Sequence, residues 1–135
     1  MNTKLLMTAS VLVLGLAGLA ATFAPAELLT AWGTPATEPT VLLVQLLGAL
    51  YFAFALLNWT AKGAIIGGIY ARPVSIGNCV HFTVGALALA KQELSHHLGW
   101  PIVVALVGYA IFAVLFGALV LGRGVPAAKG SHDPV

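Results

Sequence analysis

Long apolar runs separated by short polar stretches dominate the pattern of this chain. Each run is close in length to the roughly 20 residues that a helix needs to cross the hydrocarbon core of a bilayer. Apolar and polar residues do not alternate within the runs, as they would in the strands of a membrane barrel. Because backbone groups in lipid must be paired within their own segment, each run is expected to be helical. We predict four transmembrane helices, at residues 5–24, 41–60, 73–90 and 101–122.

Prolines and a glycine mark the boundaries of these runs. Pro25 follows the first run and Pro39 precedes the second, while Pro73 and Pro101 begin the third and fourth. Proline is tolerated in the first turn of a helix, because its missing N–H would have no partner there in any case. Gly122 ends the last run, as glycine often does at a helix C-terminus. The boundary residues therefore support four helices.

The connection between the first two runs carries a short apolar pattern of its own. Pro25 can begin a short helix that holds Leu28, Leu29 and Trp32 and ends at Gly33. Tryptophan is a residue type that anchors such segments at the membrane surface. The segment is expected either to lie in the membrane interface or to rest as a cap on the bundle.

The basic residues predict the orientation of the helices. Lys91 is the one basic residue in the two connections that also hold Glu27, Glu38 and Glu93. The others precede the first run, lie between the second and third, or follow the fourth: Lys4, Lys62, Arg72, Arg123 and Lys129. Short loops of membrane proteins carry an excess of basic residues on the cytoplasmic side. Four spans with both termini in the cytoplasm satisfy this rule at every connection.

The first run has an alternative interpretation as a secretory signal peptide. Lys4 precedes it, and the small residues Gly18 and Ala20 near its end resemble a cleavage region. The apolar part is longer, however, than the about 7–15 residues that are typical of a signal peptide. We therefore favour a retained span.

Composition places the chain among membrane proteins and excludes other classes. Of its 135 residues, 60% are hydrophobic and 7% are charged, whereas soluble domains carry about 25% charged residues. The net charge of +2 is too small for a nucleic-acid-binding surface, and the single cysteine, Cys79, allows no disulfide framework within the chain. The predicted fold is an all-α integral membrane four-helix bundle with both termini cytoplasmic. It forms one domain, residues 1–124, followed by a disordered tail at 125–135.

Polar side chains within the runs are the candidates for ligand binding, because such groups are costly in lipid and face the bundle interior. In the third run, Asn78 and His81 share a helix face, and Cys79 lies between them. At about 1.5 Å per residue, His81 reaches the bilayer midplane, and so do Tyr51 and Tyr109 on the second and fourth runs. We hypothesise that Tyr51, His81 and Tyr109 meet in the bundle core, where these residues line a cavity for a small ligand or form a proton relay. The alternative, which we favour, is that the hydrogen bonds only join the helices.

A second group of candidates lies where the second and third runs turn: Asn58, Trp59, Lys62 and Arg72. Two cations and an aromatic ring can bind an anionic lipid headgroup, or they can serve as interface anchors. We favour the anchors, because the same residues already satisfy the positive-inside rule. The apolar segment 62–72 is either a glycine-rich turn or an extension of a neighbouring helix. Glycines within the runs, among them Gly18 and Gly48, predict close helix packing, within one chain or between chains.

The stretch GGIYARPVSIGNCVHF, preceded by Asn58-Trp59, resembles small uncharacterised four-helix membrane proteins of bacteria, of the DoxX-like kind. The resemblance implies a four-helix bundle over most of the chain and residence in the bacterial inner membrane. It carries over no catalytic residue.

The sequence gives no positive indication of an enzyme. No Asp or Glu lies within a predicted span, which disfavours proton-coupled antiport through a buried carboxylate, and no phosphate loop, nucleophile motif or metal-ligand cluster occurs. We expect a structural or accessory subunit, or a binder of a hydrophobic small molecule or lipid in the bundle core, with cofactors left open. A homo-oligomeric small-molecule transporter or channel is the alternative, and a membrane enzyme using His81 is the third. The expected partners are membrane lipids and either further copies of the chain or a larger membrane complex, not nucleic acid.

Overall fold

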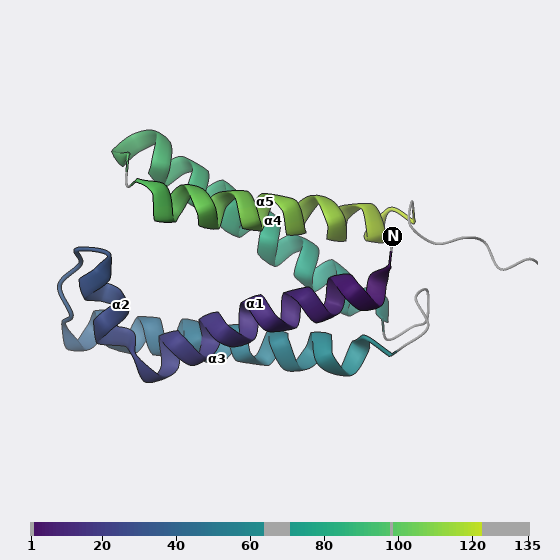
Figure 1. The fold of residues 1–135 in the computed structure, drawn as a ribbon, viewed down its shortest axis with the longest axis horizontal. Helices are drawn as coiled ribbons and strands as arrows, with labels where there is room; N and C mark the ends of the chain where they lie inside the picture. Colours follow the sequence, from purple (N-terminus) through teal and green to yellow (C-terminus); the bar gives the residue numbers. More distant parts are fainter. Residues whose placement is uncertain (1, 64–70, 98, 123–135) are drawn as a thin grey trace, which may run out of the picture. The chain divides into compact units, whose positions relative to one another are not determined.

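The computed structural model describes residues 2–63, 71–97 and 99–122, which form five helices (Figure 1). They are α1 (Thr3–Phe23), α2 (Pro25–Ala31), α3 (Glu38–Ala61), α4 (Ala71–His96) and α5 (Trp100–Val120). Four of them, α1, α3, α4 and α5, are long and apolar enough to cross a membrane. The prediction of an all-helical chain with four such helices is confirmed, and the short helix expected after Pro25 is present as α2. The tail at 125–135 and residues 64–70 of the segment 62–72 lie outside the described residues.

Local signals account for the ends of the helices. The side chain of Asn2 caps α1 by accepting a hydrogen bond from the backbone N–H of Leu5 at 3.2 Å. Thr37 and Thr40 form a reciprocal capping box at the start of α3, which satisfies N–H groups that have no partner within the helix. A proline lies in the first turn of α2, α3 and α5. Gly122 follows α5 with a φ of 72°, a conformation that glycine adopts without strain.

Helix α4 is longer than the apolar run that predicted it, because it continues through Lys91 to His96. The third predicted helix ended at residue 90, which left this stretch in the connection to the fourth. Lys91, Gln92 and Glu93 are good helix formers, and no glycine or proline interrupts the chain before Gly99. The helix therefore extends as far as its helix-forming residues allow, beyond the end of its apolar run.

The chain divides into two compact units, Asn2–Val74 and Ser75–Val135. The N-terminal unit holds α1, α2, α3 and the first turn of α4, and the C-terminal unit holds the rest of α4 and α5. In the N-terminal unit, α1 and α3 run antiparallel and pack along their length, and α2 folds against both (Figure 1). Pro25 and Leu29 of α2 are buried, so this short helix covers the α1–α3 pair with apolar side chains.

Small residues bring α1 and α3 close together. A Cβ atom at Gly18 would lie 2.9 Å from the backbone nitrogen of Phe52, and one at Gly48 would lie 2.8 Å from the backbone nitrogen of Thr22. Neither distance leaves room for a side chain, so glycine is what permits the backbones to approach. The sequence left open whether its glycines pack within one chain or between chains, and Gly18 and Gly48 pack within it.

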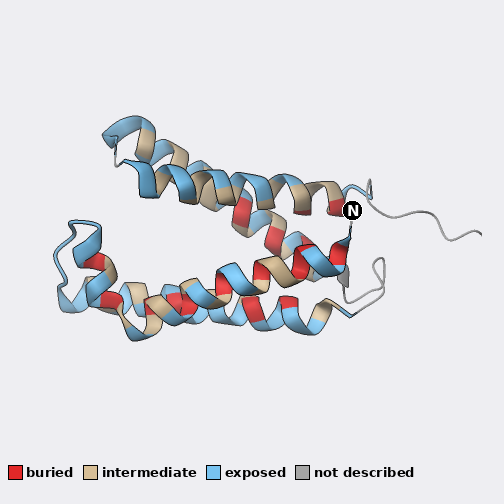
Figure 2. Cartoon of the chain, viewed as in Figure 1, coloured by how far each residue is buried: buried red, intermediate tan, exposed pale blue. Residues whose placement is uncertain are grey.

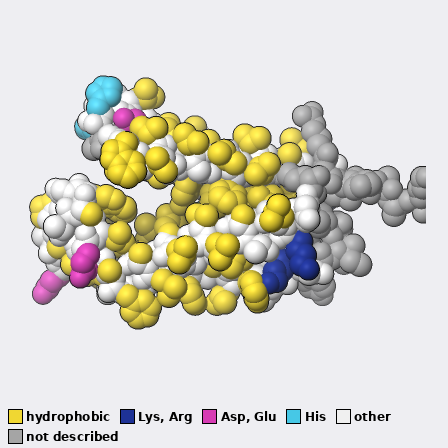
Figure 3. Space-filling model, viewed as in Figure 1, with side chains coloured by type: hydrophobic (Ala, Val, Ile, Leu, Met, Phe, Trp, Pro, Cys, Tyr) yellow, Lys and Arg dark blue, Asp and Glu magenta, His cyan; other side chains and the backbone are white. Residues whose placement is uncertain are grey.

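The outward faces of the long helices are apolar. Exposed positions run along each of these helices (Figure 2), and hydrophobic side chains cover most of the visible surface (Figure 3). Large exposed apolar side chains include Leu5, Leu12, Leu16 and Phe23 on α1, Leu42, Leu43 and Leu50 on α3, Val84 and Leu87 on α4, and Val104, Ile111 and Val114 on α5. Apolar surfaces of this extent mark sites that contact a membrane or another protein.

Candidate functional site

The candidate residues His81 and Tyr109 come together in the C-terminal unit. The Tyr109 Oη and His81 Nε2 atoms lie 3.4 Å apart, and the two rings are 5.5 Å apart between centroids. This separation is at the long end of the hydrogen-bonding range, so the contact is weak. A Cβ atom at Gly85, one turn along α4 from His81, would collide with the ring of Tyr109. Glycine at this position therefore makes room for the tyrosine beside the histidine.

An aromatic cluster extends from this pair along α5. Tyr109, Phe112 and Phe116 recur at helical spacing on one face of α5. The ring of Phe82, the residue after His81, stacks on Phe112 at 4.7 Å and on Phe116 at 5.8 Å, and meets Tyr109 edge-on at 5.2 Å. Such pairs contribute about 0.5–1.5 kcal/mol beyond the burial of their area. Our sequence analysis missed this cluster, although the spacing of the α5 aromatic residues was a signal for it.

The other third-run candidates lie on the same part of α4. Asn78 is fully buried, and the free thiol of Cys79 is half-buried. A Cβ atom at Gly117 would lie 3.8 Å from Cys79 Sγ, so the thiol faces α5. Tyr51 lies on α3 in the other unit, and its expected meeting with His81 and Tyr109 stays a prediction.

A second polar contact joins the two long helices of the N-terminal unit. The side-chain amide of Asn58 donates a hydrogen bond to Ser10 Oγ at 2.9 Å, and the Ser10 hydroxyl donates to the backbone oxygen of Met7 at 2.8 Å. Both Asn58 and Ser10 have no exposed surface. Asn58 therefore points into the α1–α3 interface. The sequence analysis grouped it with Trp59 and Lys62, but its side chain contacts α1 instead of lying with theirs. Sequence reasoning did not single out Ser10, because nothing local shows which residue of another helix faces Asn58.

The remaining candidates of this group lie near the ends of their helices. Lys62 caps the C-terminus of α3, and its Nζ atom lies over the ring of Trp59, 2.6 Å from the centroid. Trp59 is 52% exposed, and Arg72, in the first turn of α4, is also exposed. Desolvation by neighbouring protein atoms, and secondarily the positive charge of Lys4, lower the pKa of Lys62. The lysine is thus held against an aromatic ring with a second cation nearby.

The polar end of α4 holds the other histidines of the described chain. His96 is the last residue of α4, and His97 follows it with a φ of 47°. In the described ranges, no three His, Cys, Asp or Glu side chains come together as a metal site. The polar candidate residues instead make contacts between helices, Asn58 with Ser10 in the N-terminal unit and Tyr109 with His81 in the C-terminal unit.

Comparison of this chain with protein-family models, with curated proteins and with solved structures finds no match. The resemblance to DoxX-like membrane proteins therefore stays a prediction.

Proposed function

We propose that the chain is an integral membrane protein that serves as a structural or accessory subunit, inserted through α1, α3, α4 and α5. The observation that supports this function best is that polar side chains at the helix interfaces contact the neighbouring helix. Asn58 donates to Ser10 across the α1–α3 interface, and Tyr109 contacts His81 across α4 and α5. Interhelical contacts of this type stabilise the packing of helices in lipid.

Two further features support insertion with both termini on the cytoplasmic side. The exposed faces of the four long helices are apolar, as a lipid-facing surface requires. Within the N-terminal unit, Lys4 and Lys62 lie at one end of the α1–α3 pair and Glu27 and Glu38 at the other (Figure 3). Retention of the basic end in the cytoplasm follows the general bias of membrane proteins. The resemblance to DoxX-like proteins supports residence in a bacterial inner membrane. We further propose that the chain works in a homo-oligomer or a larger membrane complex.

Site-directed labelling tests this orientation. In a Cys79→Ala background, Thr34→Cys places a thiol between α2 and α3, and Gly63→Cys places one just after α3. A membrane-impermeant maleimide should label the Thr34→Cys protein in intact cells, and the Gly63→Cys protein only after the membrane is permeabilised. Equal labelling of both in intact cells, or the reverse pattern, would show that the proposed topology is wrong.

A second candidate function is the binding of a hydrophobic small molecule next to His81. The observation that favours it is the weak 3.4 Å contact between half-buried partners, which a ligand hydroxyl or carbonyl group can replace. Phe82 and Phe112 supply an apolar wall beside it, as small-molecule sites typically have.

The His81→Leu variant distinguishes the two functions. If His81 only joins helices, the variant should unfold more readily and retain the same co-purifying molecules in native mass spectrometry. If His81 binds a ligand, the variant should keep its stability and lose a molecule that the wild-type protein retains in mild detergent.

A further inference from the structure

Positive charge gathers at the end of the N-terminal unit where α1 begins and α3 ends. Lys4 lies about 9 Å along α1 from Ser10, and Lys62 lies about 6 Å along α3 from Asn58. Because Ser10 and Asn58 are hydrogen-bonded at 2.9 Å and the helices are antiparallel, this register brings the two lysines to the same end. Figure 3 shows the basic side chains of this end as one patch, and the charge of Lys4 contributes to the lowered pKa of Lys62.

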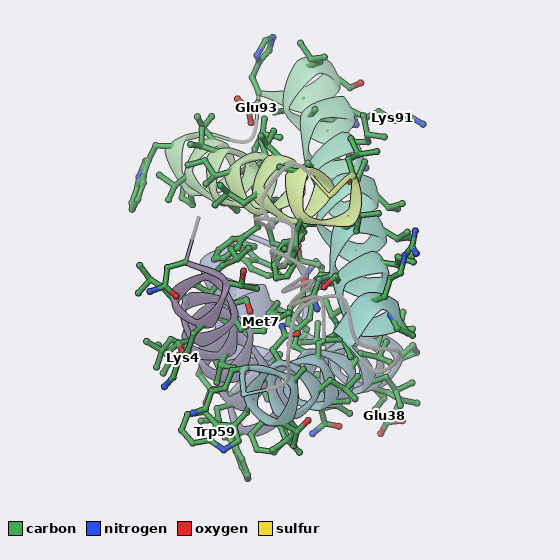
Figure 4. All side chains as sticks on the ribbon, turned by 90° about the vertical axis from the view of Figure 1, so that its right-hand side faces the viewer. Lys4, Met7, Glu38, Trp59, Lys91 and Glu93 are labelled. Carbon is green, nitrogen blue, oxygen red and sulfur yellow. The ribbon has the colours of Figure 1, made fainter. Side chains whose placement is uncertain are left out.

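Trp59 fixes the position of one of these charges. The ammonium group of Lys62 lies over the tryptophan ring, an arrangement that the negative face of the ring favours. Figure 4, viewed toward this end, shows Lys4 and Trp59 on the same side of the α1–α3 pair. Tryptophan side chains prefer the level of the lipid headgroups, so the ring holds the ammonium group of Lys62 at that depth.

In the described part of the N-terminal unit, no carboxylate lies at this end. The glutamates of this unit, Glu27 and Glu38, lie in the first turns of α2 and α3, at the opposite end. The first turn of α1 holds no acidic residue, although the partial positive charge of a helix N-terminus favours one there. Within the described residues of this unit, no carboxylate therefore offsets the charges of Lys4 and Lys62 at this end.

We propose that Lys4, Trp59 and Lys62 form a binding site for the phosphate group of an anionic membrane lipid. The two ammonium groups donate to the phosphate oxygens, and the tryptophan ring packs beside the glycerol backbone. A lipid fits better than free phosphate, because large apolar side chains are exposed near the same ends of α1 and α3: Leu5 is 67% exposed and Leu57 is 48% exposed. The site rests on the proposed insertion of α1 and α3 in the membrane, with this end at the cytoplasmic leaflet, where anionic lipids attract basic residues.

Fluorescence quenching by brominated lipids tests the site. Trp32→Phe and Trp100→Phe leave Trp59 as the single tryptophan, and the protein is reconstituted in phosphatidylcholine vesicles. Part of the lipid is replaced either by dibrominated phosphatidylglycerol or by dibrominated phosphatidylcholine, with the bromines near the headgroup. We expect the anionic lipid to quench Trp59 more than the neutral one does. Each lysine should raise the affinity for the anionic lipid, relative to the neutral lipid, by up to about fivefold.

Matched variants assign the preference to this site. Lys4→Gln and Lys62→Gln should each reduce it severalfold, Lys4→Arg and Lys62→Arg should retain it, and Lys91→Gln, at the end of α4, should leave it unchanged. An equal loss in Lys91→Gln would overturn the site in favour of a general effect of net charge. Loss of the preference when inorganic phosphate replaces chloride at constant ionic strength would overturn the assignment to a lipid.

Failure of the site and failure of membrane insertion give different results. Equal quenching of Trp59 by both brominated lipids would overturn the anionic lipid site while leaving the proposed insertion intact. No quenching by either lipid would overturn the insertion itself, and the site with it.

Discussion

The closest helix contact in the N-terminal unit gives a direct test of how α1 and α3 pack. The perturbation is Gly18→Ala, a single added methyl group facing α3. The matched control is Gly15→Ala on the same helix, where the added Cβ atom would lie 3.8 Å from the Cβ atom of Ala55, an ordinary van der Waals contact. Both variants gain the same helix propensity, about 1 kcal/mol relative to glycine, so the gain cancels when the two are compared.

The difference between the variants follows from the distances at Gly18. Its added Cβ atom would lie 2.9 Å from the backbone nitrogen of Phe52 and 3.0 Å from the backbone oxygen of Gly48, whereas non-bonded heavy atoms pack best at about 3.5–4.0 Å. Backbone atoms cannot rotate away, so α1 and α3 must separate by about 0.5–1 Å. A gap of that size forfeits about a quarter to a half of each dispersion contact. With overpacking at about 1–3 kcal/mol, we expect Gly18→Ala to be less stable than Gly15→Ala by about 1–3 kcal/mol.

The assay is unfolding in dodecyl maltoside micelles by increasing mole fractions of sodium dodecyl sulfate, followed by tryptophan fluorescence. The midpoint of Gly15→Ala should equal or exceed that of the wild-type protein, and the midpoint of Gly18→Ala should fall below both. If Gly18→Ala were as stable as Gly15→Ala, the close backbone approach of α1 and α3 would be refuted.

Further substitutions test the polar contacts in the same titration. Ser10→Ala removes an acceptor of the Asn58 amide, and should lower the free energy of unfolding by about 0.6–1.7 kcal/mol, and the losses of Ser10→Ala and Asn58→Ala should not add in the double variant; additive losses would argue against the hydrogen bond. Tyr109→Phe keeps the ring in the aromatic cluster and removes the hydroxyl group that contacts His81, a contact that should contribute about 0.6 kcal/mol; a loss several times larger would mean that the hydroxyl group stabilises the helix pair by more than this 3.4 Å contact indicates.

The sequence predicted those features of the fold that depend on a single stretch of residues. Run length and the absence of alternation predicted the four long helices, and Pro25 predicted α2, because these signals act within a few residues of the helix they specify. The end of α4 was misplaced for the same reason. Hydrophobicity drops at Lys91, but the helix-forming residues after it keep the backbone helical to His96, and helix formation does not require an apolar side chain.

The candidate sites were less accessible to sequence reasoning, because they depend on the register between helices. Helical spacing places Asn78 and His81 on one face, and the estimated depths of His81 and Tyr109 agree with their contact. No local pattern, however, pairs Ser10 with Asn58. If α1 were rotated about its own axis by the angle of one residue, a different side chain of α1 would face Asn58. The partners of a buried polar group become visible only when the packing of both helices is known.

The hydrogen bond from Ser10 to Met7 has a consequence for the order in which the chain assembles. The hydroxyl proton of Ser10 is already bonded within its own helix, so in the proposed insertion α1 enters the bilayer during synthesis without an unsatisfied hydroxyl donor at this position. Its oxygen still offers a lone pair when α3 emerges later from the ribosome carrying Asn58. On that proposal, the earlier helix is stable in lipid before its partner arrives, and it presents a hydrogen-bond acceptor to the later one.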